Sequence, residues 1–134
     1  MEHEVKLVLA SGSPRRKELL QREGISFEVM ASHVPEERDR SETPTEYARR
    51  LAGEKAIAVY EKLPKPVRVL GADTVVALGH KILEKPQDAA DAEEMLRTLS
   101  GRSHEVITAV CLIDHRGADV RHAVTKVWFR PLSI

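Results

Sequence analysis

One aspartate interrupts an otherwise apolar run, Leu70-Gly71-Ala72-Asp73-Thr74-Val75-Val76. A carboxylate is costly to bury unless a cation, a metal or several backbone donors pair with it. Thr74 adds a hydroxyl group beside it, and Gly71 would let a ligand approach the backbone. The alternative is structural, because an aspartate at a strand end often caps its own turn. The surroundings of Asp73 favour the functional interpretation.

A basic stretch near the N-terminus, Ser11-Gly12-Ser13-Pro14-Arg15-Arg16-Lys17, is the second feature with chemical potential. Ser13 followed by proline predicts a helix start, whose first turn then holds three cations. The helix dipole favours acids there, by about 0.3–1 kcal/mol per charge. A bound phosphate would reverse that penalty, since hydroxyls, free N–H groups and guanidiniums surround the position. A solvated basic helix start is the alternative, and the residues alone leave both open.

Three further candidates are ordinary when each is taken alone. Glu36 is one acid in a charged loop over 31–42, Lys55 is expected on a solvated helix face, and Lys85 precedes a proline at the end of a hairpin. The histidines have no zinc spacing and are interpreted as turn and surface groups: His3, His33, His80, His104, His115 and His122. The sequence contains no phosphate-binding Walker loop and no dinucleotide glycine fingerprint.

The elements that must position these residues follow from the apolar periodicity. Strands are predicted at 7–9, 25–30, 67–70, 81–84, 104–114 and 119–130. The strand 67–70 is predicted to end in residues 71–74, and the apolar residues 75–78 follow. Helices are predicted to begin at Pro14, Pro44 and Asp88 and to end near Gly24, Lys62 and Ser100. Gly53 weakens the second helix by about 1 kcal/mol against alanine, which close packing on a neighbouring element would explain. This β-α-β-α-β-β-α-β-β order predicts an α/β fold with a mixed sheet and flanking helices.

Composition narrows the function classes. The 134 residues are expected to form one domain, 1–134. The 21 basic and 21 acidic residues cancel, and aromatics make up 4%, so neither nucleic acid nor a membrane is expected as a partner. Cys111 is alone in an apolar alternation, which predicts a buried thiol in a reducing compartment. With no long apolar run and no export signal, we expect a cytoplasmic protein.

Five segments, taken together and in order, resemble the Maf family of nucleoside triphosphate pyrophosphatases, long linked to septum formation. They cover nearly the whole chain: Leu9-Ala10-Ser11-Gly12-Ser13-Pro14-Arg15-Arg16, Arg50-Leu51-Ala52 with Lys55-Ala56, Leu70 to Val76, Leu83-Glu84-Lys85-Pro86, and Met95-Leu96 with Leu99-Ser100-Gly101 and His104. The resemblance implies a fold like that of inosine triphosphate pyrophosphatases and a homodimer. It also implies cleavage of a nucleoside triphosphate to the monophosphate and pyrophosphate, a house-cleaning reaction that depends on Mg²⁺ or Mn²⁺.

The resemblance also implies roles for individual residues. Asp73 matches the proton acceptor, with Glu36 and Lys85 as the other acid and the lysine of the site; Glu36 and Asp73 would hold the metal. The substrate-binding positions that it implies are Ser11, Ser13, Arg15, Arg16, Lys55 and Thr74. Arg16 and Thr74 match positions tied to substrate choice. The motif around Asp73, with Pro14-Arg15-Arg16, is similar to the branch that acts on dTTP and UTP.

Two departures from the family pattern stand out. Pro35-Glu36 replaces an acidic pair, so the loop supplies one acid fewer before Glu36. The family also continues past Phe129-Arg130-Pro131-Leu132-Ser133 with a segment that carries Lys-Ala-Gly and Gln-Gly motifs and a substrate-site glutamine, which this sequence lacks. The resemblance therefore predicts a chain without the family's C-terminal segment. The alternative function is a catalytically impaired homologue that binds nucleotides or acts in the regulation of septum formation.

Overall fold

The structure, a computed structural model, describes residues 5–39 and 41–133. Within these residues the elements follow the expected order: β1 (Leu7–Leu9), α1 (Pro14–Arg22), β2 (Glu28–Val29), α2 (Pro44–Tyr60), β3 (Arg68–Leu78), β4 (Lys81–Leu83), α3 (Ala89–Leu99), β5 (Ser103–Asp114) and β6 (Gly117–Trp128). The second strand is much shorter than its alternating sequence suggests, since only its two residues opposite Val8 and Leu9 pair with β1.

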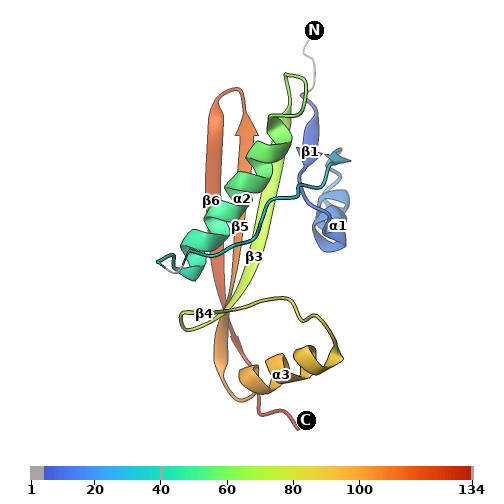
Figure 1. Ribbon diagram of the computed structural model, residues 1–134. Helices are drawn as coiled ribbons and strands as arrows, with labels where there is room; N and C mark the ends of the chain where they lie inside the picture. Colours follow the sequence, from blue (N-terminus) through green and yellow to red (C-terminus); the bar gives the residue numbers. More distant parts are fainter. Residues whose placement is uncertain (1–4, 40, 134) are drawn as a thin grey trace.

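The strands form one mixed sheet, as expected. Its order is β2-β1-β3-β5-β6, and β4 pairs with β3. The pairs of β1 with β2 and β3 are parallel, whereas the pairs of β3 with β4 and β5, and of β5 with β6, are antiparallel. Helix α2 lies across one face of the long strands, α1 lies beside β1, and α3 lies at the opposite end near the C-terminus (Figure 1).

The helix starts follow the capping rules. Ser13 and Asp88 accept hydrogen bonds from backbone N–H groups in the first turns of α1 and α3. Thr43 and Glu46 form a complete capping box at the start of α2. None of the helices in the described part of the chain is long and apolar enough to cross a membrane. Cys111 is buried, as predicted.

The histidine prediction is wrong at one position. His33, His80, His115 and His122 are exposed, and His3 lies outside the described residues. His104 is 6% exposed, and its ring meets the Phe129 ring edge-on at a centroid distance of 4.9 Å. A hydrogen bond from the backbone N–H of Phe129 to the carbonyl of Arg102 brings that ring over His104.

The prediction of a break in β3 at Asp73 is also wrong. The strand continues from Arg68 to Leu78, because β5 pairs with it without interruption over residues 69–77. Asp73 therefore lies in the middle of a strand and caps no turn. Its side chain is on the α2 face, like the buried Val69 and Val75, since alternate residues of a strand share a face.

Gly71 shows how closely α2 packs on this strand. A Cβ at Gly71 would collide with the carbonyl oxygen of Ala52 and lie 2.8 Å from the nitrogen of Ala56. Gly71 therefore admits the helix backbone, rather than a ligand as the sequence suggested. The expected close packing at Gly53 is wrong, because no heavy atom would lie within 4 Å of a Cβ there.

One edge of β3 is open in its middle. Since β5 occupies the other edge, β1 and β4 must both pair along this one, at residues 68–70 and 76–78. Among the described strands, none pairs with residues 71–75 on this edge. The chain leaves β1 at this opening and turns into α1, so the basic helix start is placed next to Asp73 and Thr74.

Candidate active site

Two groups of side chains meet at the open stretch of β3, on opposite faces of the strand. On the α2 face lies the carboxylate cluster, which we define as Glu36, Lys55 and Asp73. On the other face lies the hydroxyl cluster, which we define as Ser11, Arg16, Thr74 and Thr108.

The carboxylate cluster is organised by Lys55. Its Nζ donates hydrogen bonds to Asp73 Oδ1 at 2.9 Å and to Glu36 Oε1 at 2.8 Å. The Lys55 and Asp73 side chains are 14% and 10% exposed, whereas Glu36, on the loop before α2, is 57% exposed. The expectation of a solvated Lys55 is therefore wrong, because the face of α2 that carries it lies against the strand that carries Asp73.

Burial and charge act in opposite directions on these groups. Burial raises the pKa of Asp73 above its ordinary value, and the hydrogen bond and charge of Lys55 only partly offset this. The hydrogen bond from Lys55 lowers the pKa of Glu36, which the charge of Lys85 lowers further. Asp73 is therefore a more basic carboxylate than an exposed aspartate.

The hydroxyl cluster is organised by Arg16. One guanidinium nitrogen, Nη1, donates to Ser11 Oγ at 3.0 Å, and the other, Nη2, donates to Thr74 Oγ1 at 3.0 Å. The Oγ1 atoms of Thr74 and Thr108 lie 3.2 Å apart. Ser11 Oγ also accepts from the backbone N–H of Ser13, at 3.2 Å. Arg16 thus fixes the loop after β1 to β3.

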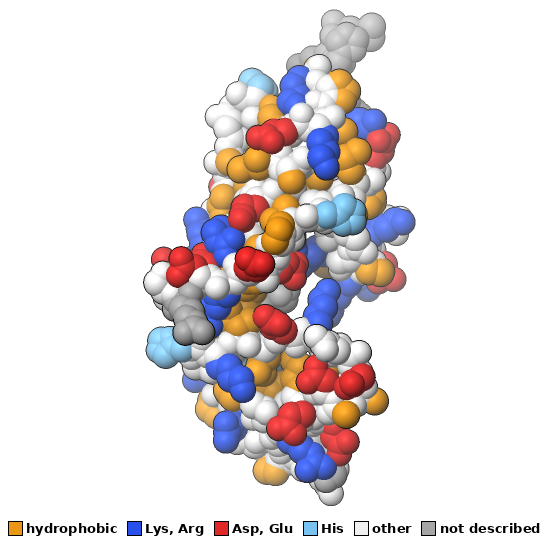
Figure 2. Space-filling view, viewed as in Figure 1, with side chains coloured by type: hydrophobic (Ala, Val, Ile, Leu, Met, Phe, Trp, Pro, Cys, Tyr) orange, Lys and Arg blue, Asp and Glu red, His pale blue; other side chains and the backbone are white. Residues whose placement is uncertain are grey.

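Arg16 links the two clusters electrostatically. Burial lowers the pKa of its guanidinium, and the charges of Asp73 and Glu36 oppose that shift. A cation from the α1 start therefore lies within electrostatic reach of the strand aspartate, as the phosphate-site interpretation requires. Figure 2 shows acidic and basic side chains close together around an indentation at mid-height of the molecule.

The remaining residues predicted from the sequence, Ser13, Arg15 and Lys85, belong to neither cluster. Ser13 caps α1 through its side chain. Arg15 is exposed on the first turn of that helix, where no acid is present. Lys85 is exposed and lines a hollow of about 330 Å³ between β4 and α3, while its charge reaches Glu36. In the described residues, neither the Arg15 nor the Lys85 side chain makes a hydrogen bond.

Thr108 was missed by the sequence interpretation. It lies inside the predicted strand 104–114, and nothing in its type or neighbours marks it. The only signal would have been the register of β3 against β5, which places Thr108 directly opposite Thr74.

The donor set suits a hard divalent cation. Two carboxylates from different elements converge on one cationic group, the ammonium of Lys55. Mg²⁺ is commonly held by one or two carboxylates, with water and substrate phosphates as its other ligands. No cluster of three or more His, Cys, Asp or Glu side chains suited to a metal occurs in residues 5–39 and 41–133. The two carboxylates of Glu36 and Asp73 fit the first pattern, in which water and phosphate supply the other ligands.

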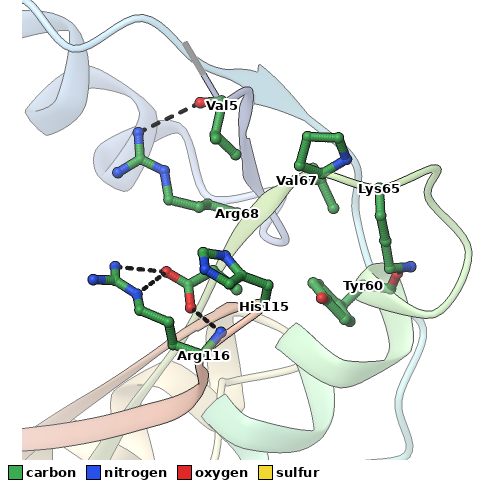
Figure 3. Close-up of a pocket in the computed structure, with 9 residues that line it drawn as sticks. Val5, Tyr60, Lys65, Val67, Arg68, His115 and Arg116 are labelled. Carbon is green, nitrogen blue, oxygen red and sulfur yellow. Dashed lines mark hydrogen bonds and ion pairs between the residues drawn. The ribbon is translucent and has the colours of Figure 1, made fainter. Parts of the chain in front are cut away.

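A larger cavity lies away from these clusters. It has a volume of about 510 Å³ and is lined by Tyr60, Lys65, Arg68 and Arg116, among others. Figure 3 shows Arg68 bonded to the carbonyl of Val5. Arg116 pairs with the carboxylate of Asp114 at 2.8 Å. None of the site residues predicted from the sequence lines it.

Known proteins resemble this chain along almost its full length. The family model described as Maf-like protein matches residues 6–134. The dTTP/UTP pyrophosphatases of Salmonella typhimurium and Escherichia coli K12 are 51% and 48% identical over 127 residues, 95% of this chain. The chain spans 64% of the length of each of these curated relatives.

Two solved structures share the fold. The Ham1 protein of Staphylococcus aureus aligns with a TM-score of 0.59 and 16% identity, over 92% of this chain and 71% of its own. A nucleoside-triphosphatase (dITP/XTP pyrophosphatase) of Mycobacterium abscessus aligns with a TM-score of 0.52 and 17% identity, over 92% of this chain and 72% of its own. The expected likeness to the inosine triphosphate pyrophosphatase fold is confirmed.

Proposed function

This chain belongs to the Maf-like family, and from that premise we propose that it hydrolyses dTTP or UTP to the nucleoside monophosphate and pyrophosphate. The relatives of about 50% identity bear the name of that activity. The observation that carries the proposal is the convergence of Glu36 and Asp73 on one cation beside the basic start of α1.

The reaction adds water across one phosphoanhydride bond. A water oxygen attacks the α-phosphorus, and the bond from that phosphorus to the bridging oxygen of the β-phosphate breaks. Asp73 accepts the water proton, and pyrophosphate leaves. The raised pKa of Asp73 supports this role, since the carboxylate binds a proton more strongly than an exposed aspartate does.

Glu36 and Asp73 are the residues that would hold Mg²⁺ or Mn²⁺, which supplies charge neutralisation at the phosphate oxygens when bound. Lys55 keeps the two carboxylates at one point, with Nζ 2.8 Å from Glu36 and 2.9 Å from Asp73. Its ammonium also offers a donor to a phosphate oxygen. Without Lys55 the two carboxylates would repel each other, so it is a positioning residue for both.

The cations around the opening would bind the triphosphate. We assign Ser11, Ser13 and Arg15 to the phosphates, together with the free N–H groups at the start of α1. We also assign Lys85 to the negative charge of the phosphates, because its own charge reaches Glu36 and lowers the pKa of that carboxyl. Arg16 and Thr74 are assigned to substrate choice. A homodimer in the cytoplasm completes the proposal and is testable by light scattering and cell fractionation.

The test is release of pyrophosphate from dTTP, UTP, CTP and ATP by the purified chain, with Mg²⁺, with Mn²⁺ and with chelator. We expect release from dTTP or UTP only with metal. Asp73→Asn should lower kcat by at least about 100-fold, the usual contribution of a general base. Asp119→Asn, an exposed aspartate on β6 paired with Arg121, is the matched control and should keep full activity.

Two results would contradict the proposal. One is the absence of pyrophosphate release from every nucleotide while the chain melts cooperatively. The other is an Asp73→Asn variant as active as Asp119→Asn. Calorimetric binding of UTP without product would instead support the alternative, a homologue that binds nucleotides without turnover.

A further inference from the structure

We propose that Thr108 is a positioning residue that fixes the direction of the Thr74 hydroxyl proton and thereby makes the site select uracil and thymine rings over cytosine. The inference rests on the proposed function, and it names a residue that is outside the family motifs quoted above. It follows from the hydrogen bonds of the hydroxyl cluster and from the surface around it.

The geometry ties Thr108 to Thr74 alone. The two residues are direct partners in the β3–β5 register, and their Oγ1 atoms lie 3.2 Å apart. Among the described residues, Thr74 is the hydrogen-bond partner of the Thr108 hydroxyl. Thr74 is exposed, whereas Thr108 is half-buried, so water reaches the first hydroxyl more easily than the second.

The number of available protons then sets the direction of each hydrogen bond in the hydroxyl cluster. A hydroxyl has one proton to donate and two lone pairs to accept with, and a guanidinium can only donate. Thr74 therefore accepts from Arg16, and it can also accept from Thr108. In that arrangement both lone pairs of Thr74 are used, so its own proton points to a ligand. Every proton in the chain of bonds has an acceptor when the ligand offers a carbonyl oxygen.

A ligand amino group breaks this arrangement. Thr74 would have to accept from Arg16 and from the amino group, and to donate its proton to Thr108. The Thr108 proton would then lack an acceptor in a half-buried position, which is unfavourable. Uracil and thymine carry a carbonyl oxygen at C4, where cytosine carries an amino group. The cluster therefore distinguishes these rings at that atom.

The surroundings suit a planar ring. Val76, Val106 and Val110 are half-buried on the same face as the two threonines, since all five are even-numbered residues of adjacent, in-register strands. An apolar wall with a few fixed polar groups is typical of sites that bind ring systems. The charged groups of the carboxylate cluster lie on the other face of the strand, around Asp73.

The test compares kcat/KM for UTP and CTP in three variants. Thr108→Val removes the hydroxyl with little change in shape, and Thr108→Ser keeps it. Thr125→Val is the matched control, because Thr125 pairs with Val106 on the same face of the neighbouring strand β6 and takes no part in the cluster. Thermal melting of each variant monitors the fold.

We expect Thr108→Val to lower the UTP-to-CTP ratio of kcat/KM by about 3–10-fold, the size of one neutral hydrogen bond. In this variant a bound amino group leaves only the proton of the exposed Thr74 without a protein acceptor, and water can accept that proton. Thr108→Ser and Thr125→Val should keep the wild-type ratio. An unchanged ratio in Thr108→Val overturns the proposal, as does an equal change in Thr125→Val or a wild-type enzyme that does not prefer UTP. If the wild type releases no pyrophosphate from any nucleotide, the proposed function fails first, and with it the premise of this inference.

Discussion

Asp73 and Thr74 are neighbours in the chain but lie in opposite environments, because successive side chains of a strand point to opposite faces. Asp73 is 7% exposed beneath α2, and an ammonium group pairs with it. Thr74 is exposed on the face without α2, and a guanidinium and a second hydroxyl contact it. At one opening, the strand thus presents a cluster of two carboxylates around an ammonium group on one face and a cluster of hydroxyl groups around a guanidinium on the other.

The difference indicates a division of labour in the proposed reaction. Charges interact more strongly where water is excluded, so proton transfer and metal binding suit the carboxylate cluster. Hydroxyl groups distinguish ligands through the direction of hydrogen bonds at little cost in stability, which suits the hydroxyl cluster. Changes in the first cluster should therefore alter stability and kcat, and changes in the second should alter KM and substrate preference.

The largest effect is expected for Lys55→Met. Removing the cation leaves two carboxylates facing each other, one of them buried, which should lower the free energy of unfolding by about 2–3 kcal/mol. Urea denaturation measures this, with Lys62→Met, an exposed lysine just after α2, as the control. Mg²⁺ should stabilise Lys55→Met more than the wild type. Equal losses in both lysine variants would show that the cluster contributes nothing specific.

The second largest effect is expected from a change in the packing of α2 on β3, on the face that carries the carboxylate cluster. Gly71→Ala should lower the free energy of unfolding by about 1–3 kcal/mol, because the new methyl group meets helix backbone that cannot move independently. Gly53→Ala, where a Cβ meets open space, should raise it by up to about 1 kcal/mol. Thermal or urea unfolding measures both changes. Opposite signs are the result that matters, and a neutral Gly71→Ala would mean that α2 packs less closely than described.

The hydroxyl cluster is tested by Arg16→Lys. An ammonium cannot bridge Ser11 and Thr74 with a planar fork as the guanidinium does. We expect KM for UTP to rise about tenfold, since a hydrogen bond from a charged donor is lost, while kcat stays within about threefold. Steady-state kinetics measures this, with Arg22→Lys in the last turn of α1 as the control. A loss confined to kcat would reverse the division of labour.

The smallest effect is expected in the pH dependence of the unfolding free energy, measured on metal-free protein. Asp73 has a raised pKa, so between the ordinary value of 3.8 and that raised value the folded chain keeps a proton that the unfolded chain has released. Stability contributed by this group therefore falls as pH rises through that window. In the presence of chelator, the unfolding free energy of the wild type minus that of Asp73→Asn should therefore fall as pH rises from 4. A constant difference would contradict the assigned burial of Asp73.

Local rules were sufficient for much of the architecture. The three helix starts follow from Ser13, Thr43 and Asp88, because capping hydrogen bonds span only three residues. The order of strands and helices follows from apolar periodicity, another short-range property. The need of Asp73 for a partner also followed from the sequence, since a lone acid in an apolar strand is costly to bury unpaired, and Lys55 pairs with it.

The identity of that partner could not be read from the sequence. Lys55 is 18 residues from Asp73 and 19 from Glu36, and Arg16 is 58 from Thr74. These pairs depend on how α2 lies on the sheet and where β1 ends against β3. For the same reason, Gly71 was interpreted as a ligand contact and His104 as a surface group.

The sequence by itself determined which residues carry charge, where the helices begin and that the fold is mixed α/β. Only the tertiary structure decided that β3 runs unbroken through Asp73, that its edge is open at residues 71–75, and that Thr108 faces Thr74. The physical reason is register. A shift of one residue between β3 and β5 would exchange the faces of the paired side chains, and no local interaction within either strand fixes that choice.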